Sequence, residues 1–598
     1  MSTRPLRDAS APADAGDGDG SRGAARRRAG NLRAVDEALP EPGPRAAGRG
    51  SLDQVLTDAA LGPGRRIFPG VAGAKAAAKL AVRPRAVARR GLELGAEIAK
   101  VAAGRSDLEA PRSDRRFKDP AWSENPGFRR LAQGYLAVAQ AADRLVSDAQ
   151  LDDTSDRRVR FAVDNLVDAL APTNFPVTNP AVLKAVIDTG GRNFVTGARH
   201  FARDMSSPPR VPSMVDRSAF AVGKDLAVTP GDVVLRTEQF ELIQYRPSTP
   251  RVRSIPLLVV PPMINKYYVA DLAPGRSMIE HVVGAGQQTF AISWRNPDRR
   301  HAEWGLDAYA GAVIQALDAV RAITGAPSSH ALGLCAGGIT LACAASHMVA
   351  MGRATEIVGL TLGVCVIDNE QAGTAGAFVD RNVAALALAE SHRRGYLDGR
   401  SLAGVFAWLR PNDLIWNYWV NNYLLGKDPP AFDILYWNAD TTNMPAALHR
   451  DFLEIALQNS LVRPGEQVVL GTPVDLSAIT ADSYLVAGIA DHITPWESAY
   501  RTTQLLGSEP RFVLSTSGHI AAMVNPPGNE RARYQTADGN PADPAEWLAG
   551  ATAHRGTWWE DWARWLGERT GRRRGAPTHA GGAGFEPLGA APGTYVHE

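Results

Sequence analysis

The sequence predicts an α/β fold: a doubly wound, mostly parallel sheet with an inserted lid, preceded by an N-terminal helical domain. Two observations lead to this prediction. Between residues 229 and 367, short apolar runs alternate with longer stretches in which apolar residues recur at helical spacing. This alternation stops over residues 368–470 and resumes near residue 483. Strands that alternate with helices form parallel sheets, and an interruption at this place is typical of a lid over the ligand-binding edge.

The strands and helices of this region are expected in the order of a doubly wound sheet. A hairpin is expected at residues 233–236 and 240–245, where helical periodicity gives way to strand periodicity. Continuous apolar runs, of the kind buried in parallel sheets, follow at 255–260, 289–294, 330–334, 357–367, 483–488 and 512–515. Helices are expected at 277–284, 306–324 and 339–351.

Residues 66–228 form the predicted N-terminal helical domain. A basic, alanine-rich stretch at 68–103 has apolar residues at helical spacing, and Pro84 must interrupt or start a helix there. Such an amphipathic helix could lie on a lipid-like surface or pack on its own domain. Further helices are expected at 128–140, 158–170 and 180–205, and this domain has no cluster of acid and base side chains that would suggest chemistry.

The two ends of the chain differ in composition from the region between them. Residues 1–65 are rich in Ala, Gly, Pro, Arg and Asp and are predicted to be a disordered tail. Residues 229–570 form the predicted sheet domain, which carries the lid at 368–470, and residues 571–598 form a second, Gly/Ala/Pro-rich tail. Trp558, Trp562 and Trp565 fall on one helical face, which predicts a helix docked on the core.

Composition limits the class of protein. The 598 residues are 45% hydrophobic and have a formal net charge of only +2, which argues against a dedicated nucleic-acid binder. Three cysteines without a C-x-x-C pair indicate a reducing compartment rather than a disulfide framework. No apolar run has the length of a transmembrane span, and the N-terminus lacks the pattern of a secretion signal. We therefore expect a cytoplasmic protein. We also expect no metal site and no bound cofactor.

The stretch Gly333-Leu-Cys335-Ala-Gly337 joins an expected strand to a helix of small residues. This G-x-C-x-G pattern resembles the nucleophile elbow of α/β-hydrolases, with cysteine in the place of serine. A nucleophile at such a turn has a strained backbone, and the flanking glycines let strand and helix approach without Cβ clashes. The turn places Cys335 at a helix N-terminus, where backbone N–H groups favour a thiolate. The alternative is a small buried cysteine in an ordinary turn.

Two later residues complete the chain order of an α/β-hydrolase triad. Asp491 and His519 each follow a predicted strand, as the acid and the histidine of that fold do. We expect His519 to deprotonate Cys335 and later to protonate a leaving group. Asp491 would fix the imidazole tautomer or act as a further base. His492, beside Asp491, is interpreted as structural.

The same arrangement predicts an oxyanion hole and a type of reaction. The backbone N–H of Ala336 should be one donor, and the second should come from the loop after residues 255–260, where Met263 is the candidate. A cysteine that attacks a thioester forms another thioester of similar energy, so the acyl group stays activated for onward transfer. Cysteine therefore favours acyl transfer over hydrolysis, provided that the aromatic lid excludes water.

Several motifs, in order, resemble those of the poly(3-hydroxyalkanoate) synthases, and the resemblance runs from about residue 114 to the end of the chain. Besides the elbow, these motifs are Asp114-Arg-Arg-Phe117, Pro120-Ala-Trp122, Leu257-Leu-Val-Val-Pro-Pro-Met-Ile-Asn-Lys266, Ser293-Trp-Arg-Asn-Pro-Asp298, Leu409-Arg-Pro-Asn-Asp-Leu-Ile-Trp-Asn-Tyr418, Asp491-His-Ile-Thr-Pro-Trp496, Ser517-Gly-His-Ile520 and Asn525-Pro-Pro527.

The resemblance implies polymerisation of (R)-3-hydroxyacyl-CoA into a growing polyester with release of CoA, which makes CoA a part of the substrate rather than a cofactor. It carries the roles of nucleophile, acid and histidine onto Cys335, Asp491 and His519. In the family the acid is often held to activate the 3-hydroxyl of the incoming unit. The resemblance further implies a single type of subunit, a homodimer that involves the lid, and a cytoplasmic location on polyester granules with their associated proteins. Residues 406–437 look more like the medium-chain synthases than the short-chain type.

Two other functions stay open at this point. A cysteine-based thioesterase or hydrolase of the same fold would use the same triad with the opposite outcome. A granule-coating protein would use the basic N-terminal helix and have no catalytic activity.

Overall fold

The computed structural model describes residues 52–61, 69–369, 381–491, 493–582 and 584–598. Most of the expected N-terminal tail and His492 lie outside these residues. A sheet of eleven strands forms the centre of the molecule, in the order β15-β14-β13-β12-β7-β6-β4-β5-β2-β1-β17. Neighbours from β13 to β5 pair in parallel, and the strands at both edges pair antiparallel. The predicted doubly wound, mostly parallel sheet is confirmed.

The strand bounds agree closely with the predicted apolar runs. The hairpin is β1 (Gly231–Arg236) and β2 (Phe240–Tyr245). The parallel strands are β4 (Leu257–Val260), β5 (Thr289–Trp294), β6 (Ser329–Leu334), β7 (Ile357–Gly363), β12 (Asp482–Gly488) and β13 (Arg511–Ser515). The sequence prediction missed β14 (Arg533–Thr536) and β15 (Thr552–Arg555), which extend the sheet antiparallel beyond β13.

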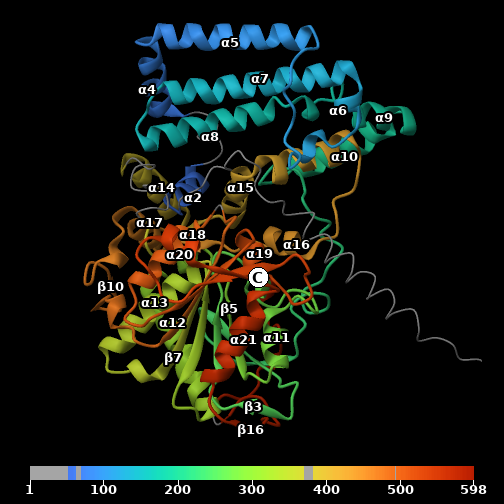
Figure 1. Ribbon diagram of the computed structural model, residues 1–598. Coiled ribbons are helices and arrows are strands. Elements are labelled where there is room, and N and C mark those ends of the chain that lie inside the picture. The colour runs from blue at the N-terminus through green and yellow to red at the C-terminus, as the bar shows by residue number, and fades with distance from the viewer. Residues whose placement is uncertain (1–51, 62–68, 370–380, 492, 583) are drawn as a thin grey trace, which may run out of the picture.

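Helices cover both faces of the sheet (Figure 1). Alternate side chains of β4 divide between two cores, because successive residues of a strand point to opposite faces. Helices α12 (Leu306–Thr324) and α13 (Ala336–Ala350) contribute to one core, and α11 (Met278–Gly284) and α21 (Trp558–Arg569) to the other. The Trp562 indole donates a hydrogen bond of 3.0 Å to Thr361 Oγ1 on β7, so the tryptophan helix docks on the sheet as predicted.

The insertion between β7 and β12 is mainly helical. Its described elements include α14 (Arg381–Arg394), α15 (Gly399–Leu409), the π-helical turns η7 (Asn412–Trp416) and η8 (Trp419–Leu424), α16 (Asp433–Ala439) and α17 (Ala446–Gln458). A buried ion pair between Asp433 and Arg276 joins α16 to the loop before α11, and the two side chains are 0% and 4% exposed. This ion pair fixes α16 to the sheet domain.

The N-terminal helices stack as a separate layer at the top of Figure 1. Its long helices are α4 (Gly70–Ala81), α5 (Pro84–Ala102), α7 (Pro126–Asp148) and α8 (Asp153–Ala169). Pro84 occupies the first turn of α5, where a missing N–H costs nothing. Helix α5 packs on α7 of its own domain, and Arg90 pairs with Asp148 at 2.7 Å. Within the described part of the chain, no helix is long and apolar enough to cross a membrane.

The helix predicted over residues 180–205 is wrong as a single element. The structure has α9 (Pro180–Thr189) and α10 (Arg192–Met205), separated by Gly190 and Gly191. These two glycines have φ of +60° and +80°, which end one helix and turn the chain into the next. Apolar spacing continues through the pair, which is why the pattern alone predicted one helix.

The predicted N-terminal tail is wrong over ten residues. Leu52–Leu61 forms helix α2, which packs among α14, α15 and α17. Val55 and Leu56 are each only 1% exposed. Apolar residues recur at helical spacing in this short piece, but the polar and glycine-rich composition of the surrounding residues conceals them.

The predicted C-terminal tail is also wrong. Strand β16 (Arg573–Gly575) pairs with β3 (Arg251–Arg253), and β17 (Gly589–Ala590) extends the main sheet beside β1. Tyr595 and Val596 are 4% and 2% exposed. The Glu241 carboxylate, itself 0% exposed, accepts hydrogen bonds from the backbone N–H groups of Thr594 and Tyr595. Strand pairing and hydrogen bonds with residues far away in the sequence order this Gly-rich segment. Its composition alone does not predict these contacts.

Candidate active site

Cys335 lies between the end of β6 and the start of α13. Its φ of 51° and ψ of −123° place a non-glycine residue in a sparsely populated backbone region. The Cys335 N–H donates a 2.9 Å hydrogen bond to the Gly363 carbonyl at the end of the neighbouring strand β7. This bond and the strand–helix junction hold the strained turn in place, so the predicted nucleophile elbow is confirmed in its backbone geometry.

The two glycines of the motif are required by close packing. A Cβ on Gly333 would lie 2.5 Å from the Cα of Gly338, and a Cβ on Gly337 would lie 2.5 Å from the carbonyl oxygens of Val260 and Pro261. All of these contacts are with backbone, which cannot move aside cheaply. The glycines therefore let α13 start directly against the ends of β6 and β4.

Asp491 and His519 are in direct contact with each other. Asp491 follows β12, and His519 is the first residue of the short helix α19 (His519–Met523), which follows β13. The His519 Nδ1 atom and the Asp491 Oδ2 atom are 2.7 Å apart. The Cys335 side chain lies close enough to His519 to raise the pKa of the imidazole, and both residues line one pocket. The structure thus brings together the three residues that chain order alone had singled out.

The surroundings of His519 favour the protonated form of its imidazole. Burial by itself lowers the pKa of His519, but the nearby charge of Asp491, its hydrogen bond and the neighbouring Cys335 side chain raise it. The net pKa of His519 lies above the ordinary value of 6.5. A histidine in this setting readily accepts a proton from a neighbouring thiol.

The Asp491 carboxylate accepts hydrogen bonds on both oxygens. Oδ1 accepts from the backbone N–H groups of Ile493 and Thr494, each at 2.9 Å. Oδ2 accepts from the Thr494 hydroxyl and from His519. The Asp491 side chain is 0% exposed. Four donors around one carboxylate stabilise its charged form and fix its orientation.

Thr494 is a residue of this site that sequence reasoning missed. Its hydroxyl lies 3.2 Å from His519 Nδ1 and also donates to Asp491. The sequence does contain a pattern that could have identified Thr494. When a threonine follows an aspartate by three residues, both side chains can form hydrogen bonds with the local backbone and with each other. Thr494 therefore contacts both members of the Asp491–His519 pair and helps to fix their positions.

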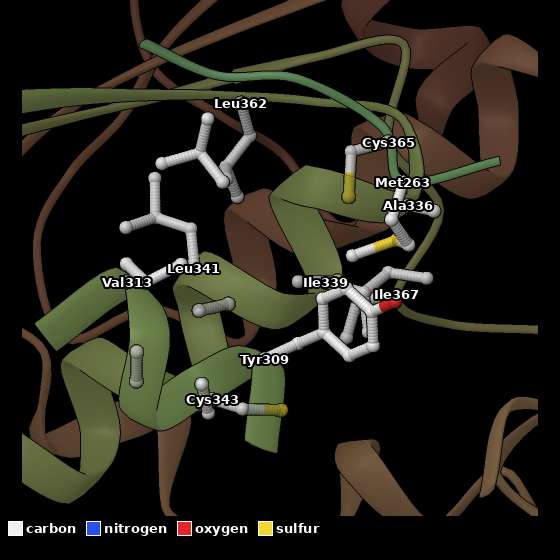
Figure 2. Close-up of a cluster of buried hydrophobic side chains, with 14 of the residues drawn as sticks. Met263, Tyr309, Val313, Ala336, Ile339, Leu341, Cys343, Leu362, Cys365 and Ile367 are labelled. Carbon is white, nitrogen blue, oxygen red and sulfur yellow. The ribbon is translucent and has the colours of Figure 1, made fainter. Parts of the chain in front are cut away.

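The other two cysteines differ sharply from Cys335. Cys343 is 0% and Cys365 is 4% exposed, and both belong to the hydrophobic core. Burial raises the pKa of Cys343 to about 12 and raises that of Cys365 well above its ordinary value. Figure 2 shows both thiols among apolar side chains. Cys335 instead is half-buried and lines a pocket.

The residues predicted for the oxyanion hole lie around the elbow. Ala336 is the first residue of α13, directly after the nucleophile. The Met263 side chain is 1% exposed and points into the core beside Ala336 and Cys365 (Figure 2). Its loop follows β4 and lies against the elbow, and its neighbours Pro262, Ile264 and Asn265 line the pocket. The role of the Met263 N–H as second donor stays a prediction.

A pocket of about 520 Å³ lies over Cys335 and His519. Much of its wall comes from the lid, as the sequence predicted, and from the segment after His519. Its apolar lining includes Pro262, Ile264, Phe406, Leu414, Ile434, Leu435, Trp437, Ile493, Ile520, Met523 and Val524. An apolar chamber around a cysteine–histidine pair excludes water and suits an acyl group.

One part of the pocket wall comes from the N-terminal helical region, where the sequence suggested no chemistry. Arg112, Ser113, Arg115 and Lys118 line the pocket together with residues of the lid. No local pattern marks these residues as part of a site, because only the docking of two distant segments brings them there.

Comparison with known proteins agrees with this geometry. Residues 113–282 match the family model described as the N-terminus of poly-beta-hydroxybutyrate polymerase (PhaC), and residues 269–526 match the model of the alpha/beta hydrolase fold. Together these two models span most of the described chain, including the elbow, Asp491 and His519.

Three relatives are similar over most of their length. Poly(3-hydroxyalkanoate) polymerases 1 and 2 of Ectopseudomonas oleovorans are 46% and 45% identical over 504 and 505 residues, which cover 84% of this chain and 90% of each relative. The polymerase subunit PhaC of Cupriavidus necator is 41% identical over 503 residues, which cover 83% of this chain and 85% of that one. This chain, with its α/β-hydrolase fold and its cysteine elbow, belongs to the poly(3-hydroxyalkanoate) polymerase family.

Proposed function

We propose that this protein is an acyltransferase that polymerises (R)-3-hydroxyacyl units from their CoA thioesters into a polyester, with release of CoA. The observation that carries the proposal is Cys335 at a strained elbow, beside a histidine whose Nδ1 atom lies 2.7 Å from the carboxylate of a buried aspartate. Family membership supports the polymerase activity, since these three relatives are all named poly(3-hydroxyalkanoate) polymerases.

In the first step the enzyme is acylated. His519 takes the proton of the Cys335 thiol, and the sulfur attacks the thioester carbonyl of the substrate. The carbonyl oxygen becomes an oxyanion that the N–H of Ala336, and by our prediction that of Met263, would stabilise. The bond to the CoA sulfur then breaks, and His519 returns the proton to that leaving group as free CoA.

In the second step the acyl group is transferred. The 3-hydroxyl of the next unit attacks the carbonyl of the acyl–Cys335 thioester, and His519 takes the hydroxyl proton. The new ester bond forms as the bond to the Cys335 sulfur breaks, and the proton returns to that sulfur. One ester is made for each CoA released, and the enzyme ends as it began.

We infer that Asp491 orients His519 and does not itself activate the 3-hydroxyl. Both of its oxygens already accept hydrogen bonds, and its side chain has no exposed surface toward the pocket. A base must come within hydrogen-bond reach of the proton that it removes. His519 lines the pocket and meets this condition, which supports one base for both steps.

The alternative is a thioesterase that uses the same triad. Two features favour transfer over hydrolysis: a cysteine nucleophile keeps the acyl group activated, and the pocket around it is lined mainly by apolar side chains from the lid. Both features reduce the chance that water reaches the acyl–enzyme before a hydroxyl does.

The test is incubation of the purified protein with 3-hydroxybutyryl-CoA and with 3-hydroxyoctanoyl-CoA. We expect release of CoA together with recovery of polyester that can be extracted and identified by nuclear magnetic resonance. Release of CoA with stoichiometric free acid and no polymer would identify a thioesterase. Absence of CoA release from either substrate would favour a non-catalytic granule protein.

We further propose that medium-chain units are the preferred substrates. The apolar lining contributed by the lid, with Phe406, Ile434, Leu435 and Trp437, supports this preference, because each additional methylene buried gains about 0.8 kcal/mol. We expect a higher kcat/KM for 3-hydroxyoctanoyl-CoA than for 3-hydroxybutyryl-CoA. The opposite ratio would assign the protein to short-chain substrates.

We also propose that the protein works as a homodimer on cytoplasmic polyester granules. Large apolar side chains that are exposed on the N-terminal helices, such as Leu92, Leu166 and Ile187, are compatible with an apolar surface. Light scattering of the purified protein, and co-sedimentation with isolated granules, test the two statements separately. A monomer that stays in the supernatant would contradict both.

A further inference from the structure

The pocket over Cys335 has a one-sided charge distribution. Apart from His519, every charged residue among its described lining is a cation. The whole chain, by contrast, has 65 Lys and Arg against 63 Asp and Glu, so its composition does not account for this excess. The cations are Arg112, Arg115, Lys118, Arg410 and Arg531. We call this set the basic rim.

The basic rim depends on a contact between segments that are far apart in the sequence. The short helix η1 (Arg115–Phe117) is held by Arg116, whose guanidinium pairs with Asp114 and Asp168. The same guanidinium donates a 3.1 Å hydrogen bond to Asn412 Oδ1 in the lid, two residues after Arg410. Arg116 thus docks residues 112–118 against the lid, so that cations of the N-terminal region and of the lid border the same pocket.

Among the described residues, two members of the basic rim form no ion pair that would stabilise the fold. The side chains of Arg112 and Lys118 are exposed, and the described residues provide neither of them with an ion-pair partner. Arg116, between them, is mostly buried and pairs with two carboxylates. The segment therefore uses Arg116 to dock, and it leaves Arg112 and Lys118 available to whatever occupies the pocket.

We propose that the basic rim binds the phosphate groups of the CoA moiety while the thioester reaches Cys335. This inference rests on the proposed function. The apolar part of the pocket suits the acyl chain, and the basic rim, which lines the same pocket, suits the anionic remainder of the substrate. That part carries a diphosphate and a 3′-phosphate, the anions that Arg and Lys side chains recognise. A cationic mouth also raises the local concentration of an anionic substrate.

This arrangement gives the N-terminal region a direct part in the reaction. Binding energy from the phosphates, which take no part in bond making, positions the thioester at Cys335. Once the acyl group has passed to Cys335, the released CoA is no longer joined to the acyl chain and can exchange for the next substrate. Salt should weaken the phosphate contacts, since the cations lie at an exposed mouth.

The test compares two thioesters that differ only in the phosphates. One is 3-hydroxyoctanoyl-CoA, and the other is the N-acetylcysteamine thioester of the same acid, which lacks every phosphate. The variant is R112E/K118E. The matched control is K184E/R199E, which changes the net charge equally at exposed cations of α9 and α10 outside the pocket lining. R112Q/K118Q is the milder variant if charge reversal disturbs folding.

We expect R112E/K118E to lower the ratio of kcat/KM for the CoA thioester to that for the cysteamine thioester by about tenfold, mainly through KM. The control should keep the ratio of the unaltered protein, and KM for the CoA thioester should rise with salt more steeply in the unaltered protein than in R112E/K118E. An unchanged ratio in both variants of Arg112 and Lys118 would overturn the inference. Failure of the unaltered protein to release CoA would instead overturn the proposed function.

Discussion

Two walls of one pocket are built in different ways. The wall at the sheet edge carries Cys335 and His519, each placed by the end of a strand, and Asp491 and Thr494 behind them. The opposite wall, made by the lid and residues 112–118, carries apolar and cationic side chains and no carboxylate among the described lining. The residues of the first wall carry out the reaction, and the residues of the second wall determine which substrate binds. Changes in the first should affect every substrate, and changes in the second should depend on the substrate.

The largest expected effect follows from removal of the nucleophile. C335A should reduce CoA release by at least about 1,000-fold, because no other thiol is among the described lining of the pocket. The rate of CoA release with 3-hydroxyoctanoyl-CoA is the measurement. C365A is the matched control: it removes a neighbouring core thiol and should keep a large part of the activity. Undiminished CoA release by C335A would exclude Cys335 as the nucleophile.

The second largest effect is expected from the loss of His519, the proposed base. H519Q should lower CoA release by about 100-fold to 1,000-fold, since the thiol loses its proton acceptor and the leaving group its donor. The rate of alkylation of Cys335 by iodoacetamide at neutral pH should fall in parallel. Equal alkylation rates in H519Q and the unaltered protein would show that His519 does not activate the thiol.

The two roles considered for Asp491 predict different results for D491N. Because Asp491 orients His519 in this structure, D491N should slow acylation and elongation by a similar factor of about 100. Single-turnover acylation and steady-state polymer formation measure the two steps separately. If D491N acylates normally and fails only in elongation, Asp491 activates the 3-hydroxyl after all.

A smaller effect is expected for the residue beside this pair. T494V keeps the shape of the side chain but removes the hydroxyl that donates to Asp491, so kcat should fall by about threefold to tenfold with little change in KM. T494S restores the hydroxyl and should recover most of the loss. A T494V enzyme with unaltered kcat and an unaltered pH profile would leave Thr494 with a packing role only.

The smallest effect is one on stability. The folded state raises the pKa of His519, so the pairing with Asp491 stabilises the protein fully below the unfolded value of about 6.5 and loses this contribution as the pH rises toward the raised pKa. The difference in unfolding free energy between the unaltered protein and H519Q should therefore be larger at pH 6 than at pH 9. A difference that grows with pH would contradict the direction of the shift.

The first wall could be predicted from the sequence because each of its features is local. A buried strand is a continuous apolar run, and the end of the strand fixes where Cys335, Asp491 and His519 lie. The Gly333 and Gly337 spacing has a single physical cause, which the contacts of these residues confirm. Thr494 left a local signal as well, in its spacing from Asp491.

The second wall could not be predicted in the same way. Arg116 and Asn412 are 296 residues apart in the chain, and their contact helps to bring Arg112 and Lys118 to the pocket. Helix α2 and the C-terminal segment were missed for a related reason. Their composition resembles a tail, but α2 finds its partners in the lid, and Gly589–Ala590 finds a strand partner in β1. Contacts with residues far away in the sequence determine the structure of these segments. Such contacts cannot be predicted from composition.

The central claim is that Cys335 carries the acyl group. The most direct test is mass spectrometry of the protein after reaction with octanoyl-CoA, which lacks the 3-hydroxyl needed for elongation and so should leave the enzyme acylated. We predict an added octanoyl group on the peptide that contains Cys335, with Cys343 and Cys365 unmodified. An octanoyl group on another residue, or CoA release from 3-hydroxyoctanoyl-CoA by protein whose Cys335 has been blocked by alkylation, would contradict the claim.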